Sequence, residues 1–388
     1  MSEYTEESVR SELRAWLEEN WDPDLSLLEW RNILVDSGWG MPQWPKEWFG
    51  RDLPVGFMRV VDEEFKRVDA ITVARKGATT LAGSTVLAHG SDMLREKFLR
   101  RSLTGEDSWC QLFSEPGNGS DLAGAMTRAE RLGNKYVVNG QKVWTTSAHL
   151  ADFGLLLART DLDVPKHDGL SYFIIDMRQP GVEVRPIKMI NGDSEFNEVF
   201  YTDALCPKDN VVGGVNNGWA VAMTLLGFER GEAAATMPIR FQAEIDRLLV
   251  LAAERGMTKD PVIRQELMKA YAKVQIMRFS GMRVLTQFLK GHHPGPDGAI
   301  SKLYWSEYHL TVTELATKIL GADAMVPSGR PPSSTFGADD AGAPNSSASW
   351  GNTFLSARAG TIYAGSSQVQ RNIIGEMVLG LPKEPRPA

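Results

Sequence analysis

The sequence is poor in cysteine, in histidine and in long apolar runs, and each shortage narrows the class of protein. Its 388 residues include two cysteines, Cys110 and Cys206, whose spacing fits no metal-ligand pattern, so we expect buried or half-buried free thiols. The six histidines are scattered, and no metal site is predicted. No apolar run reaches the length of a membrane span, and the acidic N-terminus lacks the apolar core of a signal peptide. We therefore expect a cytoplasmic protein with no membrane partner.

An excess of positive charge is also missing. The net charge is −7, and no basic stripe offsets it, so nucleic acid is not predicted as a partner. The negative net charge does not exclude an anionic ligand, because a few local hydrogen-bond donors are enough to bind one. The apolar fraction of 43% and the charged fraction of 23% are ordinary for a soluble globular protein.

The hydrophobic period divides the chain into three regions, of which the first, residues 1–108, is expected to be a helical domain. Its first apolar face predicts a helix that ends near Asn20, and a second apolar-periodic stretch covers Leu25–Val35. Two or three further helices are expected between Pro54 and Leu103. The tryptophans between these stretches are interpreted as core packing rather than as a ligand site.

Short β-prone runs without intervening helices mark the second region, residues 109–215. Tyr136–Val143 contains an Asn139-Gly140 pair, which predicts a hairpin turn at that point. Further strands are expected at Phe153–Ala158, Leu170–Asp176, Val182–Ile187 and Glu198–Tyr201. The pattern favours a compact antiparallel barrel or sandwich over a βαβ fold.

The third region, residues 216–388, returns to long helical patterns. Four helices are predicted, at Leu225–Arg255, Pro261–Leu289, Ala299–Leu320 and Phe354–Leu379. Antiparallel packing of such helices gives a four-helix bundle. The segment Val326–Ser349 is rich in Pro, Gly, Ser and Ala, and we expect an exposed mobile loop there.

Three sequence motifs indicate which chemistry the protein carries out. Residues 109–124 read Trp-Cys-Gln-Leu-Phe-Ser-Glu-Pro-Gly-Asn-Gly-Ser-Asp-Leu-Ala-Gly, in which a glycine-rich turn exposes backbone N–H groups to an anion. A dinucleotide fingerprint is excluded, because Leu122 occupies the third glycine position. Residues 139–147 read Asn-Gly-Gln-Lys-Val-Trp-Thr-Thr-Ser, and residues 362–380 contain Ile-Tyr-Ala-Gly-Ser-Ser-Gln-Val-Gln-Arg-Asn-Ile-Ile-Gly.

With these motifs in this order, the layout of helices, β domain and helical bundle resembles the acyl-CoA dehydrogenase family. The resemblance covers nearly the whole chain. It implies FAD as cofactor, an acyl-CoA thioester as substrate and electron-transfer flavoprotein as electron acceptor. The implied reaction is α,β-dehydrogenation to the 2-enoyl-CoA, in which a carboxylate removes the α-proton and the β-hydrogen leaves as hydride to flavin N5.

The same resemblance assigns roles to individual residues. Positions expected to contact the flavin are Phe113, Ser114, Ser120, Trp144, Thr146, Gly365, Ser366 and Gln368. Positions expected to contact the substrate are Ser120, Phe228, Arg230 and Ala364.

Ala364 is the main departure from the family pattern. Many members have a glutamate here, and it is their catalytic base, whereas a methyl group cannot accept a proton. Some members carry the base on a mid-chain helix, immediately before an arginine, and Glu229-Arg230 matches that arrangement. The resemblance thus implies Glu229 as base, with the backbone N–H of Ala364 still available to the substrate carbonyl. The smaller side chain at 364 favours a branched or bulky acyl group over a straight short chain.

A second departure concerns subunit assembly. Many members have an Arg-x-x-Phe-Gly run that reaches a neighbouring subunit's flavin, and residues 254–266 lack its Phe-Gly. This pattern resembles the members that assemble as α2β2 heterotetramers on steroid side chains. A homotetramer stays open, because Arg264 could substitute for the missing contact. Two other functions also stay open: a non-catalytic subunit of a heteromeric dehydrogenase, and a same-fold flavin monooxygenase or oxidase.

Overall fold

The computed structural model describes residues 4–73, 78–290, 297–330 and 342–383, with the side chains of residues 228–236, 288–289 and 297 outside that description. The chain forms two compact units, each considered by itself below. The first unit contains Met1–Met189 and Asp193–Phe228, and the second contains Ile190–Gly192 and Glu229–Ala388. The domain boundaries expected after residues 108 and 215 stay predictions.

Helices form the N-terminal part of the first unit, as the hydrophobic spacing predicted. Their bounds are α1 Glu6–Asn20, α2 Leu27–Asp36, α3 Met58–Arg67, α4 Ala78–His89 and α5 Asp92–Thr104. Side-chain caps fix two of the starts, since Thr5 accepts a hydrogen bond from Ser8 N and Ser26 from Glu29 N. Trp39 and Trp44 are buried in the core, which confirms their structural interpretation.

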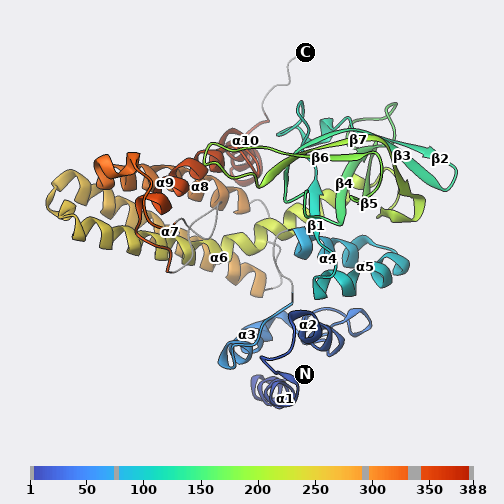
Figure 1. Cartoon of the computed structure of the whole chain (residues 1–388), viewed down its shortest axis with the longest axis horizontal. Coiled ribbons are helices and arrows are strands. Elements are labelled where there is room, and N and C mark those ends of the chain that lie inside the picture. The colour runs from blue at the N-terminus through green and yellow to red at the C-terminus, as the bar shows by residue number, and fades with distance from the viewer. Residues whose placement is uncertain (1–3, 74–77, 291–296, 331–341, 384–388) are drawn as a thin grey trace. The chain divides into compact units, whose positions relative to one another are not determined.

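A single sheet follows the helices (Figure 1). Its strands are β1 Trp109–Leu112, β2 Arg128–Leu132, β3 Lys135–Thr146, β4 Phe153–Arg159, β5 Leu170–Asp176, β6 Val182–Pro186, β7 Phe196–Pro207 and β8 Val211–Val212. The hydrogen-bonded order is β6-β7-β3-β2-β4-β5-β8, with β1 paired to β4. Strands β1 and β2 each run parallel to β4, and all the other pairs of strands are antiparallel.

The hairpin predicted at Asn139-Gly140 is wrong. Strand β3 continues through Asn139 and Gly140 without turning. The chain reverses direction earlier, between β2 and β3, where Leu132 pairs with Lys135. Gly140 instead sits at a register shift against β7, with φ 148°. A Cβ atom at Gly140 would lie 2.7 Å from Thr127 Cα, so close approach of the residue that precedes β2 explains the glycine.

The second unit is a helical bundle (Figure 1). Helix α6, Gly218–Glu254, enters it from the first unit, and the other helices are α7 Pro261–Leu289, α8 Asp297–Leu320, α9 Ser347–Ala357 and α10 Ser367–Ile373. Phe241, Leu267, Val312 and Trp350 lie in its shared core. Helix α7 has the predicted bounds. Residues 331–341 of the exposed loop expected at Val326–Ser349 lie outside the described residues. The prediction is wrong at its end, because Ser347–Ser349 begin helix α9 and Ser347 and Ser349 are buried.

The continuous helix predicted at Phe354–Leu379 is also wrong. Helix α9 ends at Ala357, and α10 begins only at Ser367. Between them Ala364 and Gly365 have φ values of 52° and 89°, which an α-helix cannot contain. The break therefore falls inside the third motif.

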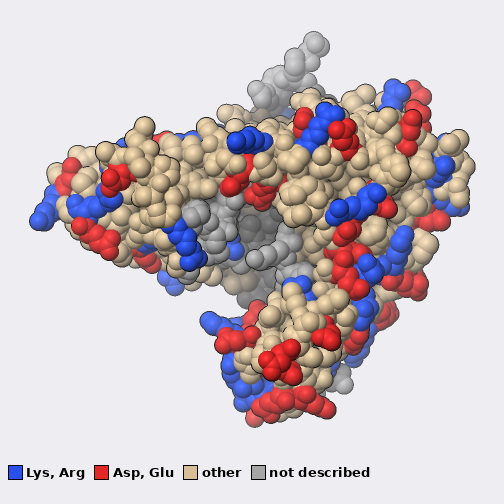
Figure 2. Space-filling view, in the orientation of Figure 1, with Lys and Arg blue, Asp and Glu red and all other residues tan. Residues whose placement is uncertain are grey.

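Three surface and burial properties complete the fold. Cys110 and Cys206 are buried free thiols, as predicted, and burial raises the pKa of Cys206 to about 12. Within the part of the chain that is described, no helix has the length and apolar character needed to cross a membrane. Figure 2 shows Lys and Arg interspersed with Asp and Glu on the visible face.

Candidate functional site

The first motif lies where strand β1 ends and the chain enters its glycine-rich turn. The ring of Phe113 is buried and meets Tyr172 of β5 edge-on, with 5.9 Å between ring centroids. The next residue, Ser114, is half-buried, and its carbonyl oxygen accepts a hydrogen bond from Val143 N at 2.9 Å. This bond joins the first motif directly to the second motif on β3.

A buried ion pair reinforces that junction. Lys142 is fully buried, and its Nζ donates to Glu115 Oε1 at 2.8 Å and to the carbonyl oxygen of Phe113 at 3.0 Å. The Glu115 carboxylate also accepts hydrogen bonds from the backbone N–H groups of Met126 at 2.7 Å and Thr127 at 2.9 Å. All of these contacts satisfy charges that would be costly to bury unpaired.

Burial and pairing act in opposite directions on these two groups. Burial lowers the pKa of the Lys142 ammonium to about 8, although the Glu115 carboxylate opposes that shift. Burial alone raises the pKa of Glu115, but the Lys142 charge and the hydrogen bonds bring it below its usual value. Glu115 and Lys142 were not assigned a role from the sequence, although both stand inside the quoted motifs.

Trp144 lies at an irregularity of strand β3. The register of β3 against β7 shifts between Lys142 and Thr145, and Trp144 there has a φ of 60°. A left-handed conformation is uncommon for a bulky residue and marks a constrained position. The indole is 58% exposed and contacts Phe196 edge-on at 6.0 Å, while Thr146 is also exposed. The bulge thus presents a flat aromatic surface that the core does not use.

The glycine-rich turn is closed by its own backbone. Glu115 N donates to the carbonyl of Asn118, and Asn118 N donates back to that of Glu115. A Cβ atom at Gly117 or Gly119 would meet no protein atom within 4 Å, so the fold itself does not demand glycine there. Ser120 follows and is exposed. The turn leaves space for a group outside the protein to approach its backbone.

The third motif forms a tight bend in the second unit. Ala364 and Gly365 both have positive φ, and the amide of Gln370 donates to their carbonyl oxygens at 3.1 and 3.3 Å. The φ of 89° at Gly365 favours glycine, since residues with a Cβ atom rarely adopt it, and a Cβ atom there would also displace the Gln370 amide. Ser366 caps helix α10 by accepting a hydrogen bond from Val369 N, which gives this predicted flavin contact a structural role as well.

Two side chains of helix α8 form hydrogen bonds to the residues on either side of this bend. Lys302 is buried, and its Nζ donates to the carbonyl oxygen of Gly360 at 2.9 Å. Burial lowers the pKa of Lys302 to about 8, against the opposing charge of Glu307. Glu307 also accepts a hydrogen bond from Ser367 Oγ at 2.8 Å. Ala364 and Gln368 are exposed on this bend.

The predicted base lies on helix α6. Phe228, Glu229 and Arg230 are helical, and their side chains lie outside the described residues. Glu229 and Ala364 belong to the same compact unit, whereas Phe228 is the last residue of the other unit. The described residues thus bring the predicted contacts together as two groups, one at the β1–β3 junction and one at the bend before α10.

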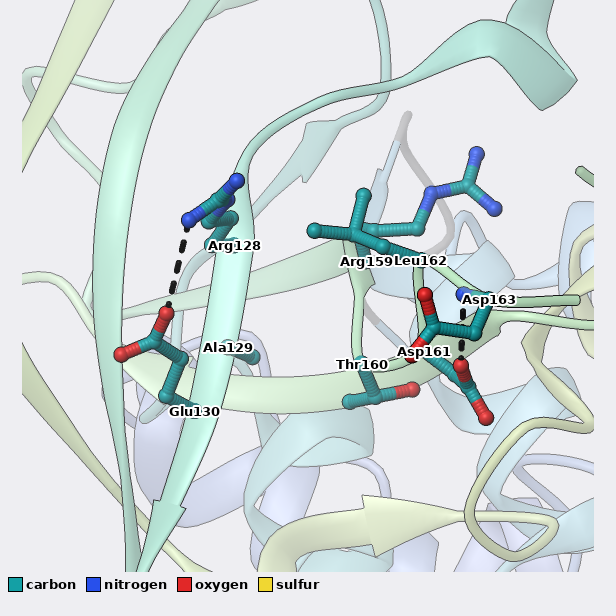
Figure 3. A pocket seen from close by; sticks show the side chains of 8 residues that line it. All are labelled: Arg128, Ala129, Glu130, Arg159, Thr160, Asp161, Leu162 and Asp163. Carbon is teal, nitrogen blue, oxygen red and sulfur yellow. Dashed lines mark hydrogen bonds and ion pairs between the residues drawn. The ribbon is translucent and has the colours of Figure 1, made fainter.

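A separate hollow opens beside strands β2 and β4 (Figure 3). Its volume is about 210 Å³, below the roughly 300 Å³ at which small-molecule pockets usually begin. Arg159 lines it but turns its guanidinium to the carbonyl oxygens of Ala123, Ala125 and Lys166. This arginine therefore shapes the chain after the first motif, and the hollow is not a candidate for the flavin.

Comparison with known proteins agrees with this architecture. Sequence models described as acyl-CoA dehydrogenase N-terminal, middle and C-terminal domains match residues 1–106, 110–204 and 216–379. The chain belongs to the acyl-CoA dehydrogenase family. Its members are oxidoreductases and flavoproteins, so the family and fold expected from the motifs are confirmed.

Several relatives are similar over nearly the full length. The chain is 37% identical to acyl-CoA dehydrogenase IpdE1 of Mycobacterium tuberculosis, over 97% of this chain and 98% of that protein. It is 26% identical to a structure described as the Tcur3481-Tcur3483 steroid ACAD, with a TM-score of 0.76 and 98% of each chain covered. The ChsE4-ChsE5 complex from Mycobacterium tuberculosis gives 25% identity and a TM-score of 0.72, covering 99% of this chain and 100% of that one.

Proposed function

We propose that this protein catalyses FAD-dependent α,β-dehydrogenation of an acyl-CoA thioester, with Glu229 as the base. The observation that carries the proposal is the methyl group of Ala364 at the position where many family members have their catalytic glutamate. A base from another helix is then required, and Glu229-Arg230 on α6 matches the alternative arrangement in the family. The two positions share one compact unit, which supports this assignment.

FAD is proposed as the cofactor because the residue chemistry at the β1–β3 junction fits a flavin. Trp144 offers an exposed aromatic face at a constrained position, and Thr146 and Ser114 offer hydroxyl groups. Gly117 and Gly119 leave open space over the backbone of a turn, as an anionic pyrophosphate requires. Phe113, Ser120, Gly365, Ser366 and Gln368 are retained as further proposed flavin contacts.

Each proposed role follows from the chemistry of the chain's own groups. The backbone N–H of Ala364 would donate to the thioester carbonyl oxygen, where negative charge develops as the α-proton leaves. A Glu229 carboxylate enclosed beside the acyl chain would have its pKa raised, which suits a base working near neutral pH. When bound, FAD supplies the acceptor for the hydride that leaves the β-carbon. Ser120, Phe228 and Arg230 would position the substrate.

A branched, bulky or steroid side-chain acyl group is the proposed substrate class. Ala364 leaves more volume near the reacting carbons than a glutamate would, and one structural relative is described as a steroid ACAD. Anaerobic titration with straight, branched and polycyclic acyl-CoAs should bleach the flavin absorbance fastest with the bulky thioesters. Bleaching only by short straight-chain thioesters would exclude this class.

A heteromeric assembly is the proposed quaternary state, with a homotetramer as the alternative and electron-transfer flavoprotein as the electron acceptor. Arg255 lies in the stretch 254–266, which corresponds to the family's crossing run, but its guanidinium donates to Leu320 O at 3.1 Å and Asp323 Oδ2 at 2.6 Å. Because the Arg255 guanidinium is already bonded within its own chain, we expect it to contribute little to flavin binding across the subunit interface. A relative is described as a two-protein complex, ChsE4-ChsE5. Cytoplasmic location stays a prediction.

A further inference from the structure

Strand β3 contains one extra residue at the point where it presents Trp144. From Lys142 to Thr145 the strand advances three residues, while its partner β7 advances two, from Val199 to Asn197. This mismatch makes the segment a β-bulge. Within it Trp144 has the left-handed φ of 60°, which bulky residues rarely adopt. The bulge is therefore strained, and the surrounding structure has to hold it in place.

Residues 195–197, where β7 begins, provide the contacts that hold the bulge. The carbonyl oxygen of Glu195 accepts a hydrogen bond from Ser147 N at 2.9 Å, and Ser147 is a second left-handed residue, with a φ of 53°. The ring of Phe196 contacts the Trp144 indole edge-on. Both ends of the exposed segment are thus tied to one short stretch of β7.

Asn197 contributes a fully buried side chain to the same bulge. Its Nδ2 donates to the carbonyl oxygen of Thr145 at 3.0 Å and to that of Glu195 at 3.2 Å. His149 Nδ1 lies 3.2 Å from Asn197 Oδ1, and because an amide oxygen can only accept, the imidazole donates there. The amide group therefore cannot rotate without losing hydrogen bonds at both of its ends.

This arrangement suits a task outside the core. A regular strand would need neither the left-handed residues nor the buried amide, and the indole that the bulge presents is 58% exposed. Local strain that is held by buried hydrogen bonds is typical of functional sites. We infer that Asn197 is a positioning residue of the flavin site, which holds the Thr145 carbonyl and so fixes Trp144 against the flavin ring. This inference rests on the FAD-dependent function proposed above and deepens it.

A comparison of two buried asparagines in the same domain tests the inference. Asn197→Leu replaces the amide by an apolar group with the same branching. Asn210→Leu makes the same change at a residue whose Nδ2 donates to Ile174 O at 2.8 Å, outside the bulge. Both should lower the urea midpoint of the apoprotein. Only Asn197→Leu should weaken FAD binding, by about tenfold in a fluorescence titration, and change the visible circular dichroism of bound flavin.

A second background shows whether Asn197 acts through the indole. When Trp144→Ala has removed the ring, adding Asn197→Leu should weaken FAD binding by no more than about twofold further. If Asn197→Leu fails to fold by circular dichroism, His149→Ala takes its place in the same titrations. His149→Ala removes the donor to Asn197 Oδ1 from an exposed position, so it should weaken FAD binding about threefold and leave the urea midpoint unchanged.

Two results would overturn this inference alone. In the first, Trp144→Ala weakens FAD binding, but Asn197→Leu changes the urea midpoint without changing the FAD affinity or the flavin dichroism, so the amide only stabilises the sheet. In the second, Asn197→Leu weakens FAD binding equally with and without Trp144. If instead Trp144→Ala leaves the FAD affinity unchanged, the proposed flavin contact of Trp144 is wrong, and the inference drawn from it is wrong as well.

Discussion

Each unit of the molecule has a buried lysine next to one group of proposed site residues, and the two lysines are stabilised differently. Lys142 of the first unit pairs with the Glu115 carboxylate, which itself accepts two backbone N–H groups. Lys302 of the second unit donates to a backbone carbonyl, that of Gly360. Burial lowers the pKa of both to about 8.

The difference indicates how firmly each motif is held. The Glu115–Lys142 pair ties the first motif to the second through two charges that depend on each other, so removing either leaves a buried charge alone. The bend before α10 is held by single hydrogen bonds to neutral partners, mainly from the Gln370 amide to two carbonyl oxygens and from Lys302 to that of Gly360. We therefore expect the β1–β3 junction to be rigid but intolerant of substitution, and the bend to be more tolerant.

The largest expected effect is the loss of Lys142. Lys142→Met should lower the free energy of unfolding by about 3–5 kcal/mol, because the Glu115 carboxylate stays buried without its cation. The matched variant Lys302→Met should cost about 1 kcal/mol, since it leaves a single carbonyl without a donor. Urea unfolding measures both. Adding Glu115→Gln to Lys142→Met should recover part of the loss, and equal costs for the two lysines would break the comparison.

A smaller effect should follow removal of the exposed indole. Trp144→Ala should weaken FAD binding about tenfold, about 1.4 kcal/mol, with little change in the free energy of unfolding, because the core does not use this ring. Fluorescence titration of apoprotein with FAD measures the affinity. Leu150→Ala, at a 60% exposed apolar residue of the same domain, is the control and should leave the affinity unchanged. A large loss of stability with unchanged affinity would make Trp144 a structural residue.

The last expected effect is a pH dependence shared by the two lysines. Burial lowers the native pKa of each to about 8, below the ordinary value of 10.5. Between these values the unfolded chain binds more protons, so each lysine's contribution to the free energy of unfolding rises with pH. The stability of wild type relative to the Glu115→Gln, Lys142→Met double variant should be flat from about pH 5 to 8 and should rise from pH 8 to 10. A relative stability that falls over that interval would contradict the shift.

Helix bounds were easier to predict from the sequence than contacts between residues that lie far apart in it. The bounds of α7 followed from its hydrophobic period, since a long amphipathic helix repeats its signal many times. The Asn139-Gly140 turn failed because pairing of β3 with β7 outweighed a local turn preference. The Glu115–Lys142 pair was not predicted, because its members are 27 residues apart and meet only through strand register.

The bend at Ala364 shows the same limit in the second unit. One helix was predicted from Phe354 to Leu379, although Gly360 and Gly365 within it are poor helix formers. Positive φ values at Ala364 and Gly365, held by the Gln370 amide, break that helix and expose position 364. The motif identified the segment, but its conformation depends on side chains that no local pattern specifies.

The most direct test of the account is the rate of flavin reduction in Glu229→Gln, measured by anaerobic stopped-flow mixing with a bulky acyl-CoA. The rate should fall about a thousandfold with FAD still bound, because glutamine cannot take the α-proton. Ala364→Glu added to that variant should restore part of the rate, and Glu254→Gln, at an exposed residue of the same helix, should have no effect. Flavin reduction by Glu229→Gln at the wild-type rate would contradict the assignment of the base.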